Sequence, residues 1–288
     1  MYFDSLARFL RADQLLLAKG PIAMVFAEDA VELDATLRHH RDAGFRQVLL
    51  FAPDDFTLAD DLAQTVTRIR YSMARDNALS EAVNAVNDAV PTGTWLYYCY
   101  NAEFLFHPFC ESRTVGELLA FHTEERRDAM LSYVIDIYAD DLEQFPNAVS
   151  LDNAYLDKSG YYALARMDGE DHARDRQLDF YGGLRWRYEE HIPAGRRKID
   201  RVSLFRSRRG LRLREDHTFD DEEYNTYSCP WHHNLTVCIC SFRTAKALKR
   251  NPGSRREITS FFWYNSARFE WNSRQLLDLG LMEPGQWF

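Results

Sequence analysis

The chain has 288 residues, of which 46% are hydrophobic and 27% charged, and this composition excludes a disordered or fibrous protein. Its net charge of -9 argues against a general nucleic-acid binder, because phosphate contacts need a positive surface. No apolar run reaches the ~18 residues of a membrane span, and charged residues interrupt the first 19 positions, where a secretory signal would be apolar. We therefore expect a cytoplasmic protein whose five cysteines are reduced thiols.

Apolar and amphipathic segments alternate along the first half of the chain. Residues 21–26 and 47–52 are short apolar runs that predict buried strands, and residues 30–43 between them have helical spacing. Gly44 fits the C′ position directly after that helix. A strand, a helix and a strand with short connections predict a parallel pair joined by a right-handed crossover.

The alternation continues and then ends. Further helices are predicted over 58–66, 78–90, 115–127 and 130–142, and further strands over 66–71 and 94–100. Beyond Pro146, short aromatic segments, glycine turns and charge clusters replace this rhythm. The predicted fold class is α/β, with a mostly parallel sheet flanked by helices and an irregular C-terminal half packed on it. We expect one domain over 1–288, with halves at 1–145 and 146–288 and with ligands at the carboxyl ends of the strands.

Three segments resemble the family 2 glycosyltransferases. The first runs from Met24 to Glu32 and continues with Leu37-Arg-His-His40 and Gly44-Phe45. The second, Trp95-Leu-Tyr-Tyr-Cys-Tyr-Asn-Ala-Glu-Phe-Leu105, is similar to the family's Trp … Asp-x-Asp-Glu-Phe-Leu strand. The third joins Lys198 to Arg206 with Pro230-Trp-His-His233 and is similar to a late segment in which a histidine returns to the active site. The resemblance implies a GT-A, Rossmann-like fold with a nucleotide-binding first half and an acceptor-side second half.

The same resemblance implies an activity and its partners. The protein would be a glycosyltransferase of the hexosyl type, which transfers a sugar from a nucleotide-sugar donor to an acceptor hydroxyl. A glycan or a lipid-linked molecule is the expected acceptor. Peripheral contact with a membrane is compatible with this activity, whereas nucleic acid is not an expected partner.

The second segment departs from the family's pattern at the metal site. When it is aligned on Glu103, the two metal-binding aspartates fall at Tyr100 and Ala102, so the usual carboxylate ligands of a divalent cation are absent. Asn101 and Glu103 remain as candidate diphosphate-side residues, or Glu103 is a strand-end carboxylate in a surface pair. Three interpretations stay open: basic side chains neutralise the diphosphate, another acid holds a metal, or a non-catalytic binding or regulatory protein retains the fold.

Two acidic pairs follow the first two predicted strands. Glu28 and Asp29 come after residues 21–26, and Asp54 and Asp55 come after residues 47–52. The resemblance implies that the nucleotide base and ribose bind here, and carboxylates accept hydrogen bonds from ribose hydroxyls. The alternative for both pairs is a helix N-cap.

Residues 179–191 form the most unusual segment, with two adjacent glycines that permit a tight turn. Arg185 and Arg187 could bind a diphosphate bidentately, and Glu189 or Glu190 could act as the general base for the acceptor hydroxyl. The alternative is an exposed amphipathic strand with paired charges. Nine basic residues follow within 196–214, and they suit a phosphate, an anionic lipid surface, an acidic acceptor or a solvated face.

Soft metal ligands gather in residues 229–240. Cys229, His232, His233, Cys238 and Cys240 could form a zinc site, although their spacing is not that of a standard knuckle. The family resemblance instead implies that His232 or His233 lies at the diphosphate. The alternating pattern over 237–240 also predicts a buried strand with small apolar thiols.

Overall fold

The computed structural model describes residues 1–12, 14–227 and 234–287, and the chain divides into two compact units. Unit 1 comprises Met1–Phe104, Ser112–Leu131 and Val202–Asn225, and unit 2 comprises Leu105–Glu111, Ser132–Arg201 and Thr226–Phe288. Each unit therefore combines segments that are distant in the sequence. The expected single domain with halves at 1–145 and 146–288 stays a prediction.

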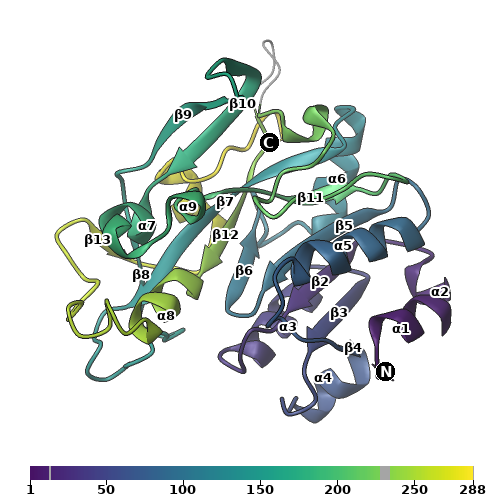
Figure 1. Cartoon of the computed structure of the whole chain (residues 1–288), viewed down its shortest axis with the longest axis horizontal. Coiled ribbons are helices and arrows are strands. Elements are labelled where there is room, and N and C mark those ends of the chain that lie inside the picture. Colours follow the sequence, from purple (N-terminus) through teal and green to yellow (C-terminus); the bar gives the residue numbers. More distant parts are fainter. Residues whose placement is uncertain (13, 228–233, 288) are drawn as a thin grey trace. The chain divides into compact units, whose positions relative to one another are not determined.

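Unit 1 holds a sheet with the strand order β1-β4-β3-β2-β5-β11 (Figure 1). Its strands are β1 (Tyr2–Phe3), β2 (Ile22–Phe26), β3 (Gln47–Ala52), β4 (Thr67–Arg70), β5 (Trp95–Tyr100) and, from Val202 onward, β11 (Asp200–Arg206). Neighbouring strands from β1 to β5 are parallel, whereas β11 runs antiparallel to β5. The predicted mostly parallel sheet is confirmed, and so are its strands near 21–26, 47–52, 66–71 and 94–100.

Helices cover both faces of this sheet. The helices of unit 1 are α1 (Leu6–Ala12), α2 (Gln14–Leu17), α3 (Leu33–Asp42), α4 (Asp60–Thr65), α5 (Ala78–Ala89), α6 (Val115–Glu124) and the 3-10 helix η3 (Glu222–Asn225). Phe9 of α1 and Val83 of α5 belong to one hydrophobic cluster with Tyr98 of β5. On the other face, His40 of α3 stacks on Tyr97, with ring centroids 5.2 Å apart. Because neighbouring strand residues point to opposite faces, unit 1 is a doubly wound, Rossmann-like α/β sheet.

Local sequence signals define the ends of two of these helices. Gly44 follows the last turn of α3 with φ 95°, as its predicted C′ position requires. At the start of α6, Thr114 and Glu117 form a capping box, in which the Thr114 N–H donates to Glu117 Oε2 at 2.7 Å. Both helices therefore begin or end where the residue types favour it.

Unit 2 is built on β7 (Ala129–Ala139), from Ser132 onward, and on β12 (Val237–Ser241), which is parallel to β7. β8 (Ala154–Asp157) is antiparallel to both β7 and β13 (Ser266–Arg268). β6 (Glu103–Phe106) follows β12 in the strand order, and its residues from Leu105 onward belong to unit 2. β9 (Tyr162–Met167) and β10 (Ala173–Tyr181) form a separate antiparallel hairpin (Figure 1).

Short helices complete unit 2. They are α7 (Gly183–Arg187), α8 (Arg243–Arg250), α9 (Ser273–Asp278) and the 3-10 helices η1 (Glu189–His191) and η2 (Ala194–Arg196). α7 contacts α8, and one hydrophobic cluster holds Leu184 of α7 with Leu248 of α8 and Tyr138 of β7. Within the described ranges of the chain, no helix combines the length and the apolar character that a membrane crossing needs.

The helix expected over 130–142 is wrong, because most of this segment is the strand β7. Val134 pairs with Ile239 of β12, and Ile137 pairs with Leu156 of β8, so strands flank β7 on both sides. Residues 132–139 are all buried, and a strand buried on both faces loses the two-residue alternation that would distinguish it from a helix. The β-branched and aromatic residues of the segment were the signal that favoured a strand.

Candidate functional site

The strand order of unit 1 reverses between β2 and β5. β3 and β4 extend the sheet on one side of β2, whereas β5 adds to the other side. In an open parallel sheet, such a switch point leaves a crevice at the carboxyl ends of the two strands, where ligands bind. Glu28 and Asp29 follow β2, and Asn101 follows β5, so these predicted site residues are brought together here.

Asn101 joins the turns that follow the two strands. Its Nδ2 donates to Asp29 Oδ1 at 2.7 Å and to the carbonyl of Val31 at 2.9 Å, and its Oδ1 accepts from the Glu28 N–H at 2.9 Å. The Asp29 carboxylate also accepts from the Val31 N–H at 3.0 Å. Because neither residue is the N-cap of α3, which is Glu32, the helix-cap alternative for Glu28 and Asp29 is wrong.

The positions that replace the family's metal-binding aspartates face the protein interior. Tyr100 is 7% exposed, and Ala102 is fully buried with φ 57°, its N–H donating to Thr36 Oγ1 at 2.8 Å. The Glu103 carboxylate is also fully buried and accepts from the Tyr100 N–H at 2.9 Å. A divalent cation prefers several accessible oxygen ligands, so this turn does not fit the metal that the resemblance implies. Because Glu103 is buried, its alternative interpretation as a strand-end carboxylate in a surface pair is wrong.

Asp54 and Asp55 lie exposed at the carboxyl end of β3. Asp54 accepts from the Tyr2 hydroxyl at 2.8 Å, and one of its oxygens lies 3.5 Å from Arg70 Nη1 at the end of β4. The N-cap of α4 is Ala59, so the helix-cap alternative for these aspartates is wrong. Both carboxylates are accessible at the same edge of the sheet as the turn after β2.

Tyr71 and Arg75 lie after β4 at this edge, and the sequence reasoning missed them. The Tyr71 ring packs edge-on against Phe26 of β2 and Phe51 of β3, with centroids 6.5 and 5.6 Å away. Arg75 Nη2 donates to the Tyr71 hydroxyl at 3.1 Å. A basic and aromatic stretch directly after a predicted strand was the signal that could have identified them, because ligands bind at strand carboxyl ends.

The start of α5 also belongs to this edge, because α5 follows β4 after a short connection. Its N-cap residue, Asn77, has φ 61° and makes no side-chain cap hydrogen bond. The first N–H groups of a helix carry partial positive charge and suit an anionic group. Arg75, which lies 3.1 Å from Glu81 in an exposed ion pair, adds a full positive charge just before the helix.

In unit 2, Arg185 makes several contacts with the interior of the unit. Its side chain is 12% exposed, its Nε donates to Thr244 Oγ1 at 3.2 Å, and its Nη1 donates to the Lys198 carbonyl. Its Nε also lies 3.6 Å from a carboxylate oxygen of Asp136, which is fully buried. Burial raises the pKa of Asp136, and the nearby Arg185 charge opposes this shift.

Arg187 also makes its contacts within unit 2. Its Nη1 lies 3.1 Å from Asp157, its Nη2 donates to the Phe261 carbonyl at 2.8 Å, and its guanidinium lies 4.3 Å from the Trp263 ring centre. The Tyr138 hydroxyl and the Trp263 Nε1–H also donate to Asp157, at 2.5 and 2.7 Å. Such contacts support a structural role, and the predicted binding of a diphosphate by Arg185 and Arg187 stays a prediction.

The sequence reasoning missed both buried aspartates of this network. Asp136 interrupts an apolar run, and a single charge in such a run is a signal for a buried polar contact.

Gly183 allows α7 to approach Asp136, because a Cβ there would lie 3.1 Å from its Oδ2. Gly182 has φ 152°, and a Cβ there would overlap the Tyr161 ring at 2.3 Å. The absence of a Cβ at both glycines therefore permits a close approach of the backbone to Asp136 and Tyr161.

Glu189 and Glu190 lie exposed on η1. Glu189 Oε2 is 3.3 Å from Arg197 Nη1, and Glu190 Oε1 is 3.7 Å from His191 Nε2. The alternative interpretation of this segment was an exposed amphipathic strand with paired charges. Its paired charges are present, but the strand is wrong, because β10 ends at Tyr181 and helices follow. The general-base role of either glutamate stays a prediction.

The predicted zinc and diphosphate ligands of residues 229–240 are only partly described. Cys229, His232 and His233 lie outside the described residues, whereas Cys238 and Cys240 are buried free thiols in β12, as the strand interpretation predicts. Burial raises the pKa of the Cys240 thiol. Among the residues that the structure describes, no group of three or more histidine, cysteine or acidic side chains could hold a metal ion.

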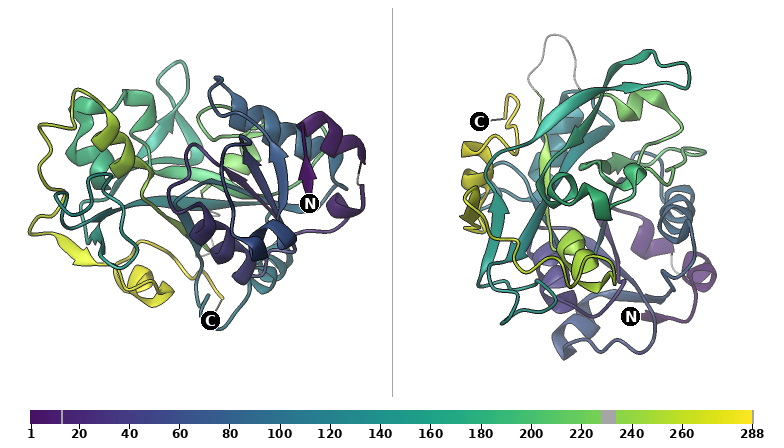
Figure 2. Two further views of the ribbon diagram at one scale, coloured as in Figure 1. Left: turned by 90° about the horizontal axis from the view of Figure 1, so that it is seen from below. Right: turned by 60° about the vertical axis from the view of Figure 1, so that its left-hand side comes forward.

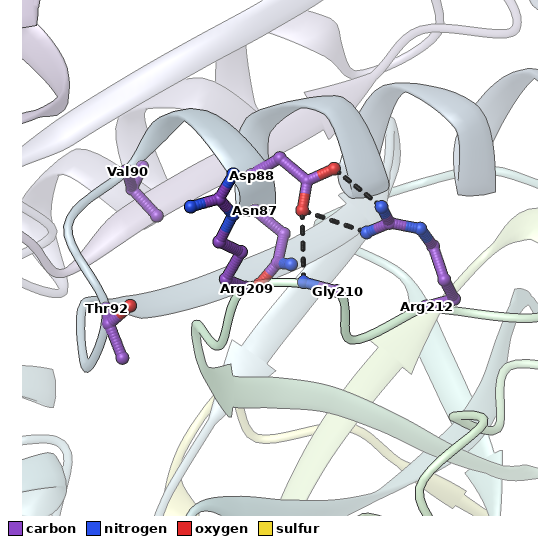
Figure 3. A pocket seen from close by; sticks show the side chains of 7 residues that line it. All are labelled: Asn87, Asp88, Val90, Thr92, Arg209, Gly210 and Arg212. Carbon is purple, nitrogen blue, oxygen red and sulfur yellow. Dashed lines mark hydrogen bonds and ion pairs between the residues drawn. The ribbon is translucent and has the colours of Figure 1, made fainter.

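A pocket of about 480 Å³ lies at the C-terminal end of α5 (Figure 3). Its lining residues are Asn87, Asp88, Val90, Thr92, Arg209, Gly210 and Arg212. Asp88 faces two groups of the predicted basic block: an ion pair joins it to Arg212 at 2.8 Å, and the Gly210 N–H donates to it at 3.4 Å. Since α5 ends at the edge where β5 starts, this pocket is not at the carboxyl ends of the strands.

Four arginines of the basic block form ion pairs with acidic residues of unit 1. Arg206 pairs with Asp128 at 2.9 Å, Arg208 pairs with Asp221, and Arg214 lies 3.7 Å from Glu222. These pairs, together with Arg212 and Asp88, match the solvated-face interpretation better than a phosphate site.

Comparisons with known proteins add little to this description. No protein-family model matches the chain, and no curated protein matches it. Among solved structures, the chain is similar to a UDP-glucose pyrophosphorylase from Acinetobacter baumanii, with a TM-score of 0.35 and 9% identity, over 84% of this chain and 96% of that chain. A likeness of this degree carries no functional argument, so the family 2 resemblance stays a prediction.

Proposed function

We propose that this protein is a glycosyltransferase that binds a nucleotide sugar at the carboxyl ends of β2, β3 and β5 in unit 1 and transfers the sugar to an acceptor hydroxyl. The observation that carries the proposal is the reversal of strand order between β2 and β5, with polar residues following both strands. The family resemblance supplies the reaction type, and the geometry of unit 1 supports the nucleotide-binding part of it.

The base and ribose of the donor would bind near the acidic residues at this edge. Asp54 and Asp55 are exposed after β3, and Glu28 is exposed after β2, where Asn101 orders its backbone. Carboxylates held on ordered turns accept hydrogen bonds from ribose hydroxyls without a large loss of conformational entropy. Tyr71, which follows β4 and packs edge-on against Phe26 and Phe51, offers an aromatic ring for the base.

The diphosphate of the donor would be neutralised by cations of the chain rather than by a carboxylate-held metal. Arg70 and Arg75 carry exposed guanidinium groups after β4, and the uncapped start of α5 adds the positive end of its dipole. Charge-assisted hydrogen bonds of this kind contribute about 1.5–3 kcal/mol each. This assignment explains how the turn at Tyr100 and Ala102 can lack aspartates in an active enzyme.

The test is release of a nucleoside diphosphate from the full chain incubated with UDP-, GDP- and dTDP-hexoses and simple glycan acceptors. We expect release from at least one donor at a rate that EDTA leaves unchanged. An Asp55→Asn variant should raise the KM for the donor, and Asp152→Asn, an exposed aspartate of unit 2, is the matched control. Donor turnover that requires added Mn²⁺ would overturn the metal-free assignment.

The second candidate is a non-catalytic protein that binds the nucleotide and has lost transfer. The buried Ala102 and Glu103 favour this second candidate, because the turn that holds a metal in the family 2 glycosyltransferases is part of the core in this protein. Nucleotide binding without turnover of any donor would support this candidate over the first.

A further inference from the structure

The segment 242–268 of unit 2 is strongly basic in an acidic protein. It contains seven lysine and arginine residues and one acidic residue, Glu257, and so carries a charge of +6, whereas the whole chain carries -9. The segment comprises α8, the loop that follows it and β13 (Figure 2). Charge asymmetry of this size indicates an anionic partner.

The loop between α8 and β13 has an ordered backbone. Lys249 Nζ donates to the carbonyls of Arg255 and Ile258, at 2.9 Å each, and Ile258 is buried in the same hydrophobic cluster as Phe261. Arg255 and Arg256 are exposed on this backbone. In the described part of the chain, neither guanidinium pairs with a carboxylate, and Glu257 lies 3.4 Å from His191.

Two large aromatic side chains extend from the same loop. Phe262 is 50% exposed and Tyr264 is 87% exposed, whereas Trp263 between them turns inward and donates to Asp157 at 2.7 Å. The inward Trp263, stacked under Arg187, fixes the neighbours in outward positions. The fold therefore holds a phenyl ring and a phenol in water beside two unpaired arginines.

We propose that residues 249–264, the basic-aromatic loop, dock unit 2 on an anionic lipid bilayer. Arginines at the headgroup level are attracted by anionic lipids, and tyrosine and phenylalanine rings are stable at the interface between headgroups and acyl chains. A soluble phosphate polymer would satisfy the arginines but would leave the Phe262 ring in water, so a bilayer accounts for both features. This inference stands apart from the proposed function, since no residue of unit 1 contributes to it.

The experiment is co-sedimentation of the full chain with phosphatidylcholine vesicles and with vesicles that also contain phosphatidylglycerol. We expect partition into the anionic vesicles only, weakened by high salt, because each basic residue near the surface contributes about fivefold to partition. An R255E/R256E variant should bind at least tenfold more weakly. Its matched control, R126E/R127E, changes a pair of neighbouring arginines in unit 1 and should bind as the unmodified protein does.

A second pair of variants tests the aromatic part. F262S/Y264S should weaken binding at least fivefold, whereas Y162S/L164S, which removes two exposed apolar side chains of β9, should not. Circular dichroism melts of all four variants identify any that fail to fold. The inference would be overturned by equal binding to neutral and anionic vesicles, by no binding to either, or by control variants that lose as much binding as the loop variants.

Discussion

Asn101 donates to Asp29 across 2.7 Å, and this bond links the ends of the two strands between which the sheet of unit 1 reverses its order. The two residues lie 72 positions apart in the sequence. A single amide side chain thereby orders the turn that carries Glu28 at the proposed nucleotide site. Its geometry depends on the parallel pairing of β2 and β5, which the contact stabilises in turn.

Replacement of Asn101 by alanine should destabilise the protein and loosen this turn. Three hydrogen bonds of a fully buried side chain are lost, at about 1 kcal/mol each, so we expect a loss of about 2–4 kcal/mol in the free energy of unfolding. Urea denaturation measures the change. A loss below 0.5 kcal/mol, near the effect of an ordinary surface substitution, would mean that the turn is held by other contacts.

Replacement of Arg75 by alanine should weaken nucleoside diphosphate binding at least tenfold with little effect on stability. The guanidinium is exposed and contacts Tyr71 and Glu81, so its removal leaves no buried charge. Isothermal titration calorimetry measures the affinity. Arg46→Ala is the matched control, because Arg46 is exposed at the opposite end of the sheet, just before β3. Equal affinities for the two variants would remove Arg75 from the site.

Replacement of Arg187 by alanine should cost about 3–5 kcal/mol of stability, because Asp157 would keep a buried charge without its cation. Chemical denaturation tests this, with Arg197→Ala as the control, since Arg197 pairs with the exposed Glu189. Titration of the folded variant with nucleotide separates the two roles of Arg187. A tenfold loss of affinity would support the sequence-based diphosphate role, and an unchanged affinity would restrict Arg187 to the structure of unit 2.

Stability should fall as the pH drops below about 6.5. Burial lowers the pKa of His40 to about 3 and that of His122 to about 4, whereas both have ordinary values near 6.5 in the unfolded chain. The unfolded state therefore binds more protons between pH 6.5 and 4, and each histidine removes up to about 1.4 kcal/mol per pH unit there. Denaturation midpoints from pH 7 to pH 4 measure this slope. A flat profile would mean that these imidazoles bind protons in the folded protein as readily as in the unfolded chain.

The sheet of unit 1 could be predicted because each signal was local. The apolar runs at 21–26 and 47–52, and Gly44 after the helix between them, act through neighbouring residues. The turn at Asn101 could be placed at a strand end, but its contact with Asp29 depends on the strand order, which no local pattern encodes. The segment of β7 was wrongly predicted as a helix because strands pair with it on both sides. The ion pair between Arg187 and Asp157 could not be predicted, because it depends on the tertiary structure.

The central claim is that unit 1 binds a nucleotide without a carboxylate-held metal. Calorimetric titration of the full chain with UDP, GDP and dTDP, once with Mn²⁺ and once with EDTA, tests it most directly. We expect at least one nucleotide to bind with a dissociation constant that agrees within twofold between the two conditions. Absence of binding to every nucleotide at millimolar concentration, or binding that appears only with Mn²⁺, would contradict the claim.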